Sequence, residues 1–171
     1  NNRALITLNN MVNIEQLLND LCFQPIGEHN GIIKRIKGVI SNTKPNPQKL
    51  FVAEGIWLAS MCLKFGTPIE SLIVCPEHVR TPEVAELIKN LSSRTQDRFS
   101  VSAKTYEKIS EKGQPDGIMA LAALPQWDIS RFNPPQKAVI LVIDGVEIPG
   151  NAGTMLRMPG GAGADAVFFC N

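Results

Sequence analysis

This sequence of 171 residues has little excess charge, few aromatic residues and no long hydrophobic run. Its 17 basic and 16 acidic residues nearly cancel, so overall charge says nothing about a nucleic-acid partner. No apolar stretch reaches the ~18 residues that suggest a membrane-spanning helix, and the first residues show no signal-peptide pattern. These absences favour a cytoplasmic globular protein, with 44% hydrophobic residues available for a core.

Cysteine and histidine are also scarce. Four cysteines are scattered along the chain without a CxxC pair: Cys22, Cys62, Cys75 and Cys170. This pattern predicts buried free thiols in a reducing compartment rather than a disulfide framework or a zinc site. His29 and His78 lie near no recognisable nucleophile motif, so we predict no metal site and no histidine-based catalysis.

Glycine-rich segments raise dinucleotide binding as an alternative function. Glycines recur between residues 145 and 163, but no GxGxxG opens a helix after a strand. No acidic residue closes a second strand ~20 residues further on. A GxxxxGK[ST] segment is also missing, which excludes an ordinary P-loop. Nicotinamide binding is therefore left as a minor alternative.

Most of the chain alternates between strand and helix patterns, which predicts an α/β domain over residues 28–125. Strands are predicted at residues 50–53, 71–75, 99–102 and 117–124. Helices are predicted at residues 31–40, 56–65 and 106–110, and from residue 82 onward with Thr81 as N-cap. The helix at 56–65 is almost wholly apolar, which predicts that it is buried. An extension with a short helix, residues 1–27, precedes this domain. A proline-rich linker at residues 126–136 and a second domain at 137–171 follow it.

A run of cations lies in the first part of this domain. Five cations occur between Glu28 and Glu54 with no acid among them: Lys34, Arg35, Lys37, Lys44 and Lys49. Isoleucines at helical spacing predict that residues 31–40 form a helix with a basic outer face. A solvated helix face is the ordinary explanation. A run of one sign beside a basic loop is better explained by contacts with phosphates.

Residues 137–171 carry the strongest functional signal. An apolar, β-branched run at 138–143 predicts a strand that is buried on both faces. Asn151 is predicted as the N-cap of a short helix over 152–158, which Pro159 ends, and residues 166–170 predict a second strand. Ligands gather at the carboxyl ends of strands in such units, so the turn at 147–153 is the first candidate site.

The predicted helix carries an arginine near a small residue. Gly153, Thr154 and Arg157 share one helical face, which leaves room for an anionic group near the positive end of the helix. An RNA phosphate would suit that geometry. The ordinary alternatives are an exposed helix arginine and a capping asparagine.

Residues 144–157, DGVEIPGNAGTMLR, closely resemble the first motif of the SpoU/TrmH family of RNA ribose methyltransferases, in the SPOUT superfamily. FVAEG at 51–55, residues 110–120 and GADAV at 163–167 are similar to further parts of that family in the same order, so the resemblance covers roughly residues 27–171. It implies an RNA-binding α/β domain like that of ribosomal proteins, followed by a Rossmann-like catalytic domain with a trefoil knot. Such proteins work as homodimers.

The resemblance also implies a cofactor, a substrate and site residues. The cofactor is S-adenosylmethionine, and the substrate is a ribose 2′-hydroxyl of rRNA or tRNA. The motif asparagine and arginine of the family correspond to Asn151 and Arg157 as catalytic residues, and Glu54 joins the five cations as a predicted RNA-binding residue. Because a guanidinium is a poor base, chemistry alone assigns Arg157 to phosphate anchoring and hydroxyl orientation.

The sequence departs from the family pattern in three places. The second and third motifs, which build the knot and hold the cofactor, are expected beyond Asn171. Residues 158–161, MPGG, replace a helical stretch, and residues 43–46 keep only a lysine where an arginine is usual. We therefore expect this chain alone to be inactive. The alternative is a non-catalytic RNA-binding module with a vestigial methyltransferase domain.

Overall fold

The computed structural model describes residues 13–41, 46–146 and 148–170. They belong to two compact units: unit 1 is Asn1–Pro125 and unit 2 is Gln126–Asn171. Lys44, a predicted RNA contact, lies outside the described residues, as does part of the predicted 147–153 turn. No helix in the described ranges is long and apolar enough to cross a membrane.

Unit 1 is built around a five-stranded sheet with the order β1-β4-β3-β5-β2. Its strands are β1 (Gln24–Pro25), β2 (Leu50–Glu54), β3 (Ile69–Val74), β4 (Asp97–Ser100) and β5 (Ile118–Ala123). β1, β4 and β3 pair in parallel, and β5 lies antiparallel between β3 and β2. The mixed α/β class is therefore confirmed. Residues 13–27, predicted as an extension, contribute a helix and an edge strand to this unit.

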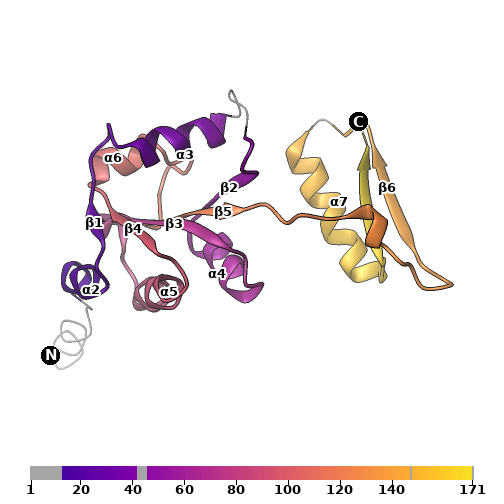
Figure 1. The fold of residues 1–171 in the computed structure, drawn as a ribbon, viewed down its shortest axis with the longest axis horizontal. Coiled ribbons are helices and arrows are strands. Elements are labelled where there is room, and N and C mark those ends of the chain that lie inside the picture. The colour runs from indigo at the N-terminus through magenta and orange to yellow at the C-terminus, as the bar shows by residue number, and fades with distance from the viewer. Residues whose placement is uncertain (1–12, 42–45, 147, 171) are drawn as a thin grey trace, which may run out of the picture. The chain divides into compact units, whose positions relative to one another are not determined.

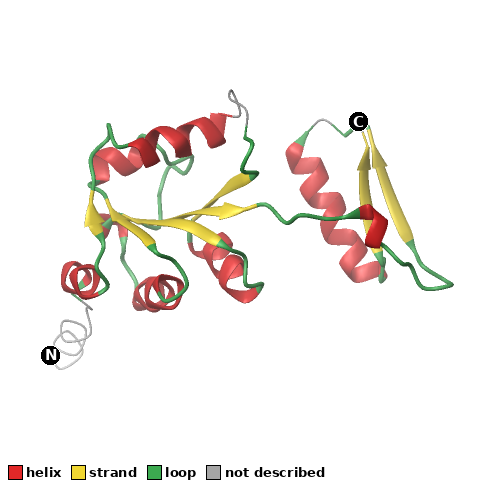
Figure 2. Cartoon of the chain, viewed as in Figure 1, coloured by secondary structure: helices red, strands yellow, loops and turns green. Residues whose placement is uncertain are grey.

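Helices cover both faces of the sheet (Figure 1). α3 (Gly31–Ser41) and α6 (Ala103–Glu107) lie on one face, and α2 (Ile14–Asp20), α4 (Ile56–Lys64) and α5 (Pro82–Ser92) lie on the other. A short 3-10 turn, η1 (Pro76–His78), connects β3 to α5. Figure 2 shows the resulting three layers of helix, sheet and helix.

The central strands of unit 1 divide the hydrophobic core into two layers. Successive strand residues point to opposite faces, so Leu72 and Val74 pack under α4 and α5, while Ile73 and Cys75 pack under α3 and α6. All four side chains are fully buried. The sheet therefore buries apolar side chains on both faces, which explains why β5 is a continuous hydrophobic run.

The prediction that the helix at 56–65 is buried was wrong. Ala59 and Cys62 face the sheet and are buried, but Trp57 is 67% exposed and Phe65 is 71% exposed. A helix in an outer layer buries only the stripe that contacts the sheet, whatever its composition on the other side. The prediction that all four cysteines are buried was wrong for two of them. Cys62 and Cys75 are buried, but Cys22 and Cys170 are exposed.

Unit 2 is a strand–helix–strand arrangement. β6 (Ile140–Asp144) pairs in parallel with β7 (Ala166–Cys170), and α7 (Pro149–Ala162) connects them. A second 3-10 turn, η2 (Ile129–Arg131), lies in the predicted linker.

The predicted limits of α7 were wrong at both ends. α7 begins at Pro149, so Asn151 lies in its first turn and is not the N-cap. Proline suits a first helical turn because its φ is preset and its missing N–H needs no partner there. The helix also runs through Pro159 to Ala162, since an interior proline removes one hydrogen bond without stopping the residues beyond it. Gly163 follows with a φ of +68°, a conformation that terminates helices.

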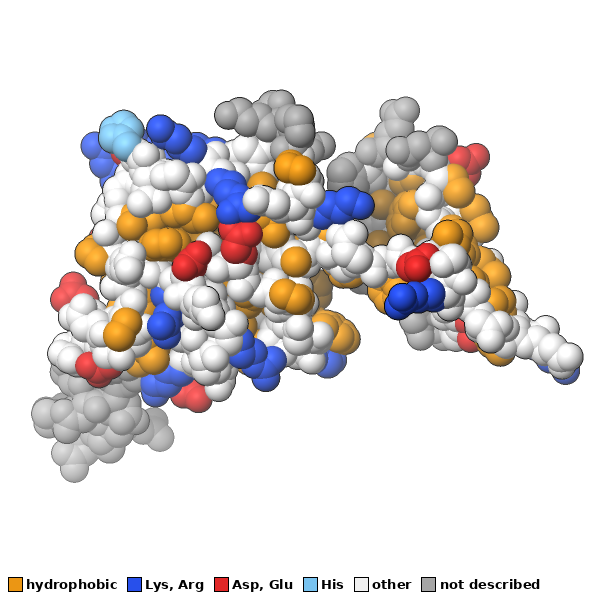
Figure 3. Space-filling model, in the orientation of Figure 1, with side chains coloured by type: hydrophobic (Ala, Val, Ile, Leu, Met, Phe, Trp, Pro, Cys, Tyr) orange, Lys and Arg blue, Asp and Glu red, His pale blue; other side chains and the backbone are white. Residues whose placement is uncertain are grey.

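The prediction that β6 is buried on both faces was also wrong. Ile143 is 5% exposed, but Val142 is 58% exposed and Ile140 is 42% exposed. Within the described part of unit 2, β6 has one neighbouring strand and one helix, which cannot cover both faces of a sheet. Hydrophobic side chains accordingly occupy much of the visible surface of this unit (Figure 3).

Candidate nucleic-acid interface

α3 presents lysines to solvent because its isoleucines face the sheet. Ile33 and Ile36 are fully buried, and Lys34 and Lys37 are exposed on the outer side. Neither lysine has an ion-pair partner among the described residues. Lys49, directly before β2, is also exposed. The predicted basic outer face of this helix is therefore confirmed for its two lysines.

Arg35 is held within unit 1. Its guanidinium donates hydrogen bonds to both carboxylate oxygens of Glu70, at the start of β3, and to the side-chain oxygen of Gln48. Such a bidentate arginine–carboxylate pair has fixed geometry. The arginine thus attaches α3 to β3 and to the segment that precedes β2. Lys34 and Lys37 are left as the outward cations of this helix.

Glu54 lies beneath the surface at the end of β2. It is 9% exposed, and its two carboxylate oxygens accept hydrogen bonds from the Ser110 hydroxyl and from the Glu111 backbone N–H at 3.0 Å. The structure therefore brings together two segments that carried the family resemblance, FVAEG and residues 110–120. With both oxygens engaged, Glu54 holds the 110–111 backbone in place.

The turn between β2 and α4 meets the same segment. Gly55 has a φ of +89°, and an added Cβ would lie 2.0 Å from the Lys112 ammonium and 2.5 Å from an Asp116 carboxylate oxygen. That oxygen accepts hydrogen bonds from Lys112 Nζ at 2.9 Å and from the Ile56 N–H at 3.3 Å. Hydrogen bonding to Lys112 is the main cause that lowers the pKa of the Asp116 carboxyl. A carboxylate distant in sequence thus caps the start of α4.

An aromatic pair that the sequence did not indicate lies nearby. The rings of His78 and Tyr106 pack edge to face at 5.8 Å. Tyr106 is completely buried, and burial is the main cause that raises the pKa of its hydroxyl. Neither the hydroxyl nor the two ring nitrogens of His78 has a hydrogen-bond partner in the described part of the chain. We therefore assign this pair to packing and not to the cationic surface.

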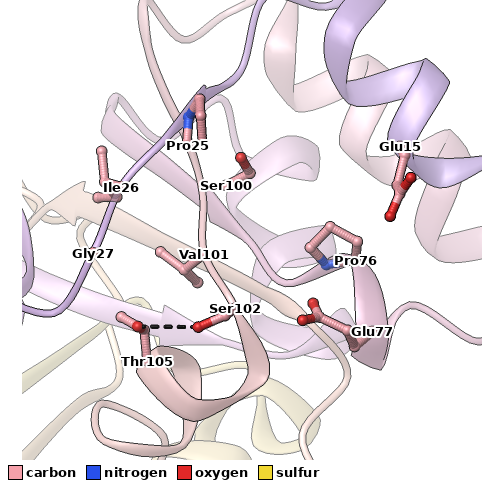
Figure 4. A pocket seen from close by; sticks show the side chains of 10 residues that line it. All are labelled: Glu15, Pro25, Ile26, Gly27, Pro76, Glu77, Ser100, Val101, Ser102 and Thr105. Carbon is pink, nitrogen blue, oxygen red and sulfur yellow. Dashed lines mark hydrogen bonds between the residues drawn. The ribbon is translucent and has the colours of Figure 1, made fainter.

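A pocket of about 470 Å³ lies where β1, β3 and β4 end (Figure 4). Its polar lining consists of acids and hydroxyls: Glu15, Glu77, Ser100, Ser102 and Thr105. Glu77 accepts hydrogen bonds from the Cys75 thiol at 3.3 Å and from the Ala103 N–H at 3.2 Å. Burial, followed by Glu77, raises the pKa of the Cys75 thiol to about 12. An acidic lining does not suit a phosphate, so this pocket is separate from the cationic surface.

Asn151 and Arg157 lie on α7, which begins after the carboxyl end of β6. Asn151 is exposed in the first turn, and the Thr154 hydroxyl donates a hydrogen bond to the Gly150 carbonyl at 2.9 Å. Arg157 is six positions after Asn151, which places the two Cα atoms on different sides of the helix. Across residues 13–41, 46–146 and 148–170, no cluster of histidine, cysteine and acidic side chains could hold a metal ion.

Unit 1 is an α/β domain with a cationic helix, and a strand–helix–strand unit follows it in sequence. The chain belongs to the family with the MRM3-like substrate binding domain, whose model matches residues 30–120. The resemblance to SpoU/TrmH RNA ribose methyltransferases is confirmed by this match and by the relatives of the chain.

Relatives of the chain include named methyltransferases. It is 29% identical over 134 residues to the 23S rRNA (guanosine(2553)-2′-O)-methyltransferase RlmP of Bacillus subtilis, covering 78% of this chain and 48% of that protein. A crystal structure of an RNA 2′-O ribose methyltransferase is 29% identical, with a TM-score of 0.64, over 86% of this chain and 56% of the other. This chain spans about half the length of the curated relatives it matches.

An rRNA methyltransferase from Sinorhizobium meliloti, solved with AdoMet bound, shares the fold at 21% identity and a TM-score of 0.72. The alignment covers 87% of this chain and 56% of that chain. The likeness therefore extends beyond unit 1 into unit 2, since 87% of the chain exceeds the length of unit 1.

Proposed function

We propose that this chain is the substrate-binding domain and first catalytic segment of an S-adenosylmethionine-dependent methyltransferase acting on a ribose 2′-hydroxyl of rRNA or tRNA. The observation that carries the proposal is the family match of residues 30–120, followed in the same chain by the strand–helix–strand unit with Asn151 and Arg157. Relatives named as RNA methyltransferases support the reaction class. The proposal includes a homodimer that works in the cytoplasm.

Unit 1 would hold the RNA and unit 2 would begin the catalytic site. Lys34, Lys37 and Lys49 are exposed cations that can neutralise backbone phosphates without reading sequence. Arg157 would anchor a phosphate and orient the ribose hydroxyl while staying protonated, and Asn151 would supply an amide that hydrogen-bonds the substrate. S-adenosylmethionine, when bound, supplies an electrophilic methyl group.

The described residues of unit 2 do not enclose a cofactor. Added Cβ atoms at Gly145, Gly150 and Gly153 would meet nothing within 4 Å, so the space beside these three glycines is open. A nucleoside needs walls that bury most of its surface. We therefore assign no described residue to S-adenosylmethionine, and we expect this 171-residue chain not to bind it at micromolar concentration, as calorimetry can measure.

Methyl transfer tests the proposal directly. A version extended through the remainder of the methyltransferase domain should transfer labelled methyl groups from S-adenosylmethionine to rRNA or tRNA. The modified nucleotide should resist alkaline cleavage, because a methylated 2′-oxygen cannot attack the adjacent phosphate. RNA binding without transfer by the extended protein would instead support the non-catalytic RNA-binding alternative.

Arg157→Ala in the extended protein tests the residue assignment. A group that acts mainly in the transition state should lower kcat at least a hundredfold, ~2.7 kcal/mol, with little change in cofactor affinity. Lysine should not restore turnover, since a point charge cannot replace a planar fork. Normal turnover of Arg157→Ala, with intact folding, would remove the catalytic assignment while leaving the family unchanged.

A further inference from the structure

A second cationic feature lies beside α3 and adds Lys108, which the sequence pattern did not single out, to the predicted phosphate contact Lys37. A hollow of about 240 Å³ opens between the C-terminal half of α3 and the segment after α6. Residues from both elements line it: Lys37, Ile40, Ser41, Lys108, Ile109, Ser110 and Glu111. α3 and α6 lie on the same face of the sheet (Figure 1), so the elements that line the hollow belong to the α3 face.

The hollow has a lysine on each side. Lys37 comes from α3 and has no ion-pair partner in the described ranges. Lys108 follows α6 and pairs with Glu28. The side chains of this pair are 40% exposed for Lys108 and 35% exposed for Glu28. Such an exposed pair is weak, so an incoming anion can displace Glu28 from Lys108.

The floor and far wall of the hollow are fixed. Ile109 is 2% exposed and forms the floor with the half-buried Ile40. The wall at 110–111 is held from beneath by Glu54, which accepts hydrogen bonds from the Ser110 hydroxyl and from the Glu111 N–H. A wall held in this way orders the chain segment next to Lys108 before any ligand binds, which lowers the ordering cost of binding.

We propose that this hollow seats a backbone phosphate of bound RNA between Lys37 and Lys108, with Glu54 as a positioning residue for the wall that carries Lys108. The inference rests on the proposed RNA binding and extends it from one helix to a two-sided clamp. The apolar floor suits the ribose next to the phosphate. Two ammonium groups can share one phosphate because each offers three donors.

Affinity of the 171-residue chain for a fluorescein-labelled RNA hairpin, measured by anisotropy over a range of salt, tests the clamp. Lys37→Ala and Lys108→Ala should each weaken binding about fivefold and reduce the salt slope by roughly 0.7 to 0.9, the value for one lost phosphate contact. If both lysines hold one phosphate, the double variant should lose less than the product of the single losses. Lys104→Ala is the matched control, because Lys104 is an exposed lysine of α6 outside the hollow.

Two variants should strengthen binding. Glu111→Gln removes the one acid that lines the hollow, and Glu28→Gln releases Lys108 from its pair, so each should raise affinity about twofold to threefold.

Ser110→Ala, which removes a hydrogen bond to Glu54, should keep the fold but abolish the coupling between Lys37 and Lys108. Retained coupling in Ser110→Ala would remove the positioning role of Glu54.

Failure of this inference differs from failure of the proposed function. If the unchanged chain does not bind the hairpin, RNA binding itself is wrong. If it binds, and Lys34→Ala weakens binding while Lys108→Ala behaves like Lys104→Ala, then α3 contacts RNA alone and the clamp does not exist. Equal weakening by Lys104→Ala and Lys108→Ala would indicate diffuse attraction and would also overturn the clamp.

Discussion

The two faces of the unit 1 sheet bury similar cores but carry different charge. The helices of one face, α3 and α6, together have four cations and one acid, whereas α2, α4 and α5 on the opposite face together have four acids and two cations. The difference disappears in the overall net charge of +1. Distribution of charge over the fold, and not its total, is therefore the property that indicates a polyanionic partner.

Cations on the α3 face also differ in what they do. Arg35 is bound to Glu70 and Gln48 within the unit, while Lys34 and Lys37 point outward. A planar guanidinium suits the fixed internal pair, and flexible ammonium groups suit mobile contacts with phosphates. We therefore predict that the two faces of the sheet contribute equally to the stability of unit 1 but unequally to RNA binding.

The largest expected effect is on stability and should be the same for both faces. Ile36→Ala on the α3 face and Ile88→Ala on the α5 face each remove a fully buried side chain. Each should lower the free energy of unfolding by about 3 kcal/mol, as for other buried isoleucines. Urea denaturation of the two variants measures this. A loss several times larger for one face would show that the cores are not equivalent.

Charge reversal should separate the faces by RNA affinity. Lys34→Glu with Lys37→Glu on α3 should weaken binding of an RNA hairpin about a hundredfold, because two attractive contacts become repulsive. Lys64→Glu with Lys89→Glu on the opposite face changes net charge equally and is the matched control. Anisotropy titrations at one salt concentration should give less than about a threefold change for the control. Similar losses of affinity from both pairs would show that the two faces do not differ in RNA binding.

Replacement of Arg35 should affect stability more than binding. Arg35→Ala leaves Glu70 without its bidentate partner, and both side chains are about one-third exposed. We expect a loss of about 1 kcal/mol in the free energy of unfolding, near the upper limit for exposed pairs. RNA affinity should fall less than in Lys34→Ala. An Arg35→Ala variant of normal stability that binds RNA poorly would return Arg35 to the predicted phosphate contacts.

The smallest effect concerns the cap of α4 and depends on pH. Asp116→Asn should cost about 1 kcal/mol at pH 7, since it weakens the contacts with Lys112 and the Ile56 N–H. The folded-state pKa of Asp116 is lowered, so its stabilisation is complete above the ordinary carboxyl pKa and is lost as pH falls through the folded value. Denaturation midpoints of the two proteins should therefore converge in acid. A difference that is constant between pH 7 and pH 3 would show that Asp116 does not act through its charge.

Sequence patterns predicted most elements of unit 1 because its strands and helices have clear periodicity. β2, β3, β5, α3 and α4 lie within one or two residues of their predicted limits. β1 was not predicted, since two residues are too short to show a period, and only pairing with β4 makes them a strand. In unit 2 the element types were predicted, but β6 was assigned two buried faces because composition does not reveal how many neighbours a strand has.

The sequence alone determined the order of most elements, the family and the basic face of α3, because each of these depends on local spacing or on a continuous motif. Tertiary structure decided which charges remain available. It paired Arg35 with Glu70, buried Glu54 beneath residues 110–111 and placed Lys108 across a hollow from Lys37. These contacts join segments that are distant in the chain, and their energies depend on geometry that no local pattern specifies.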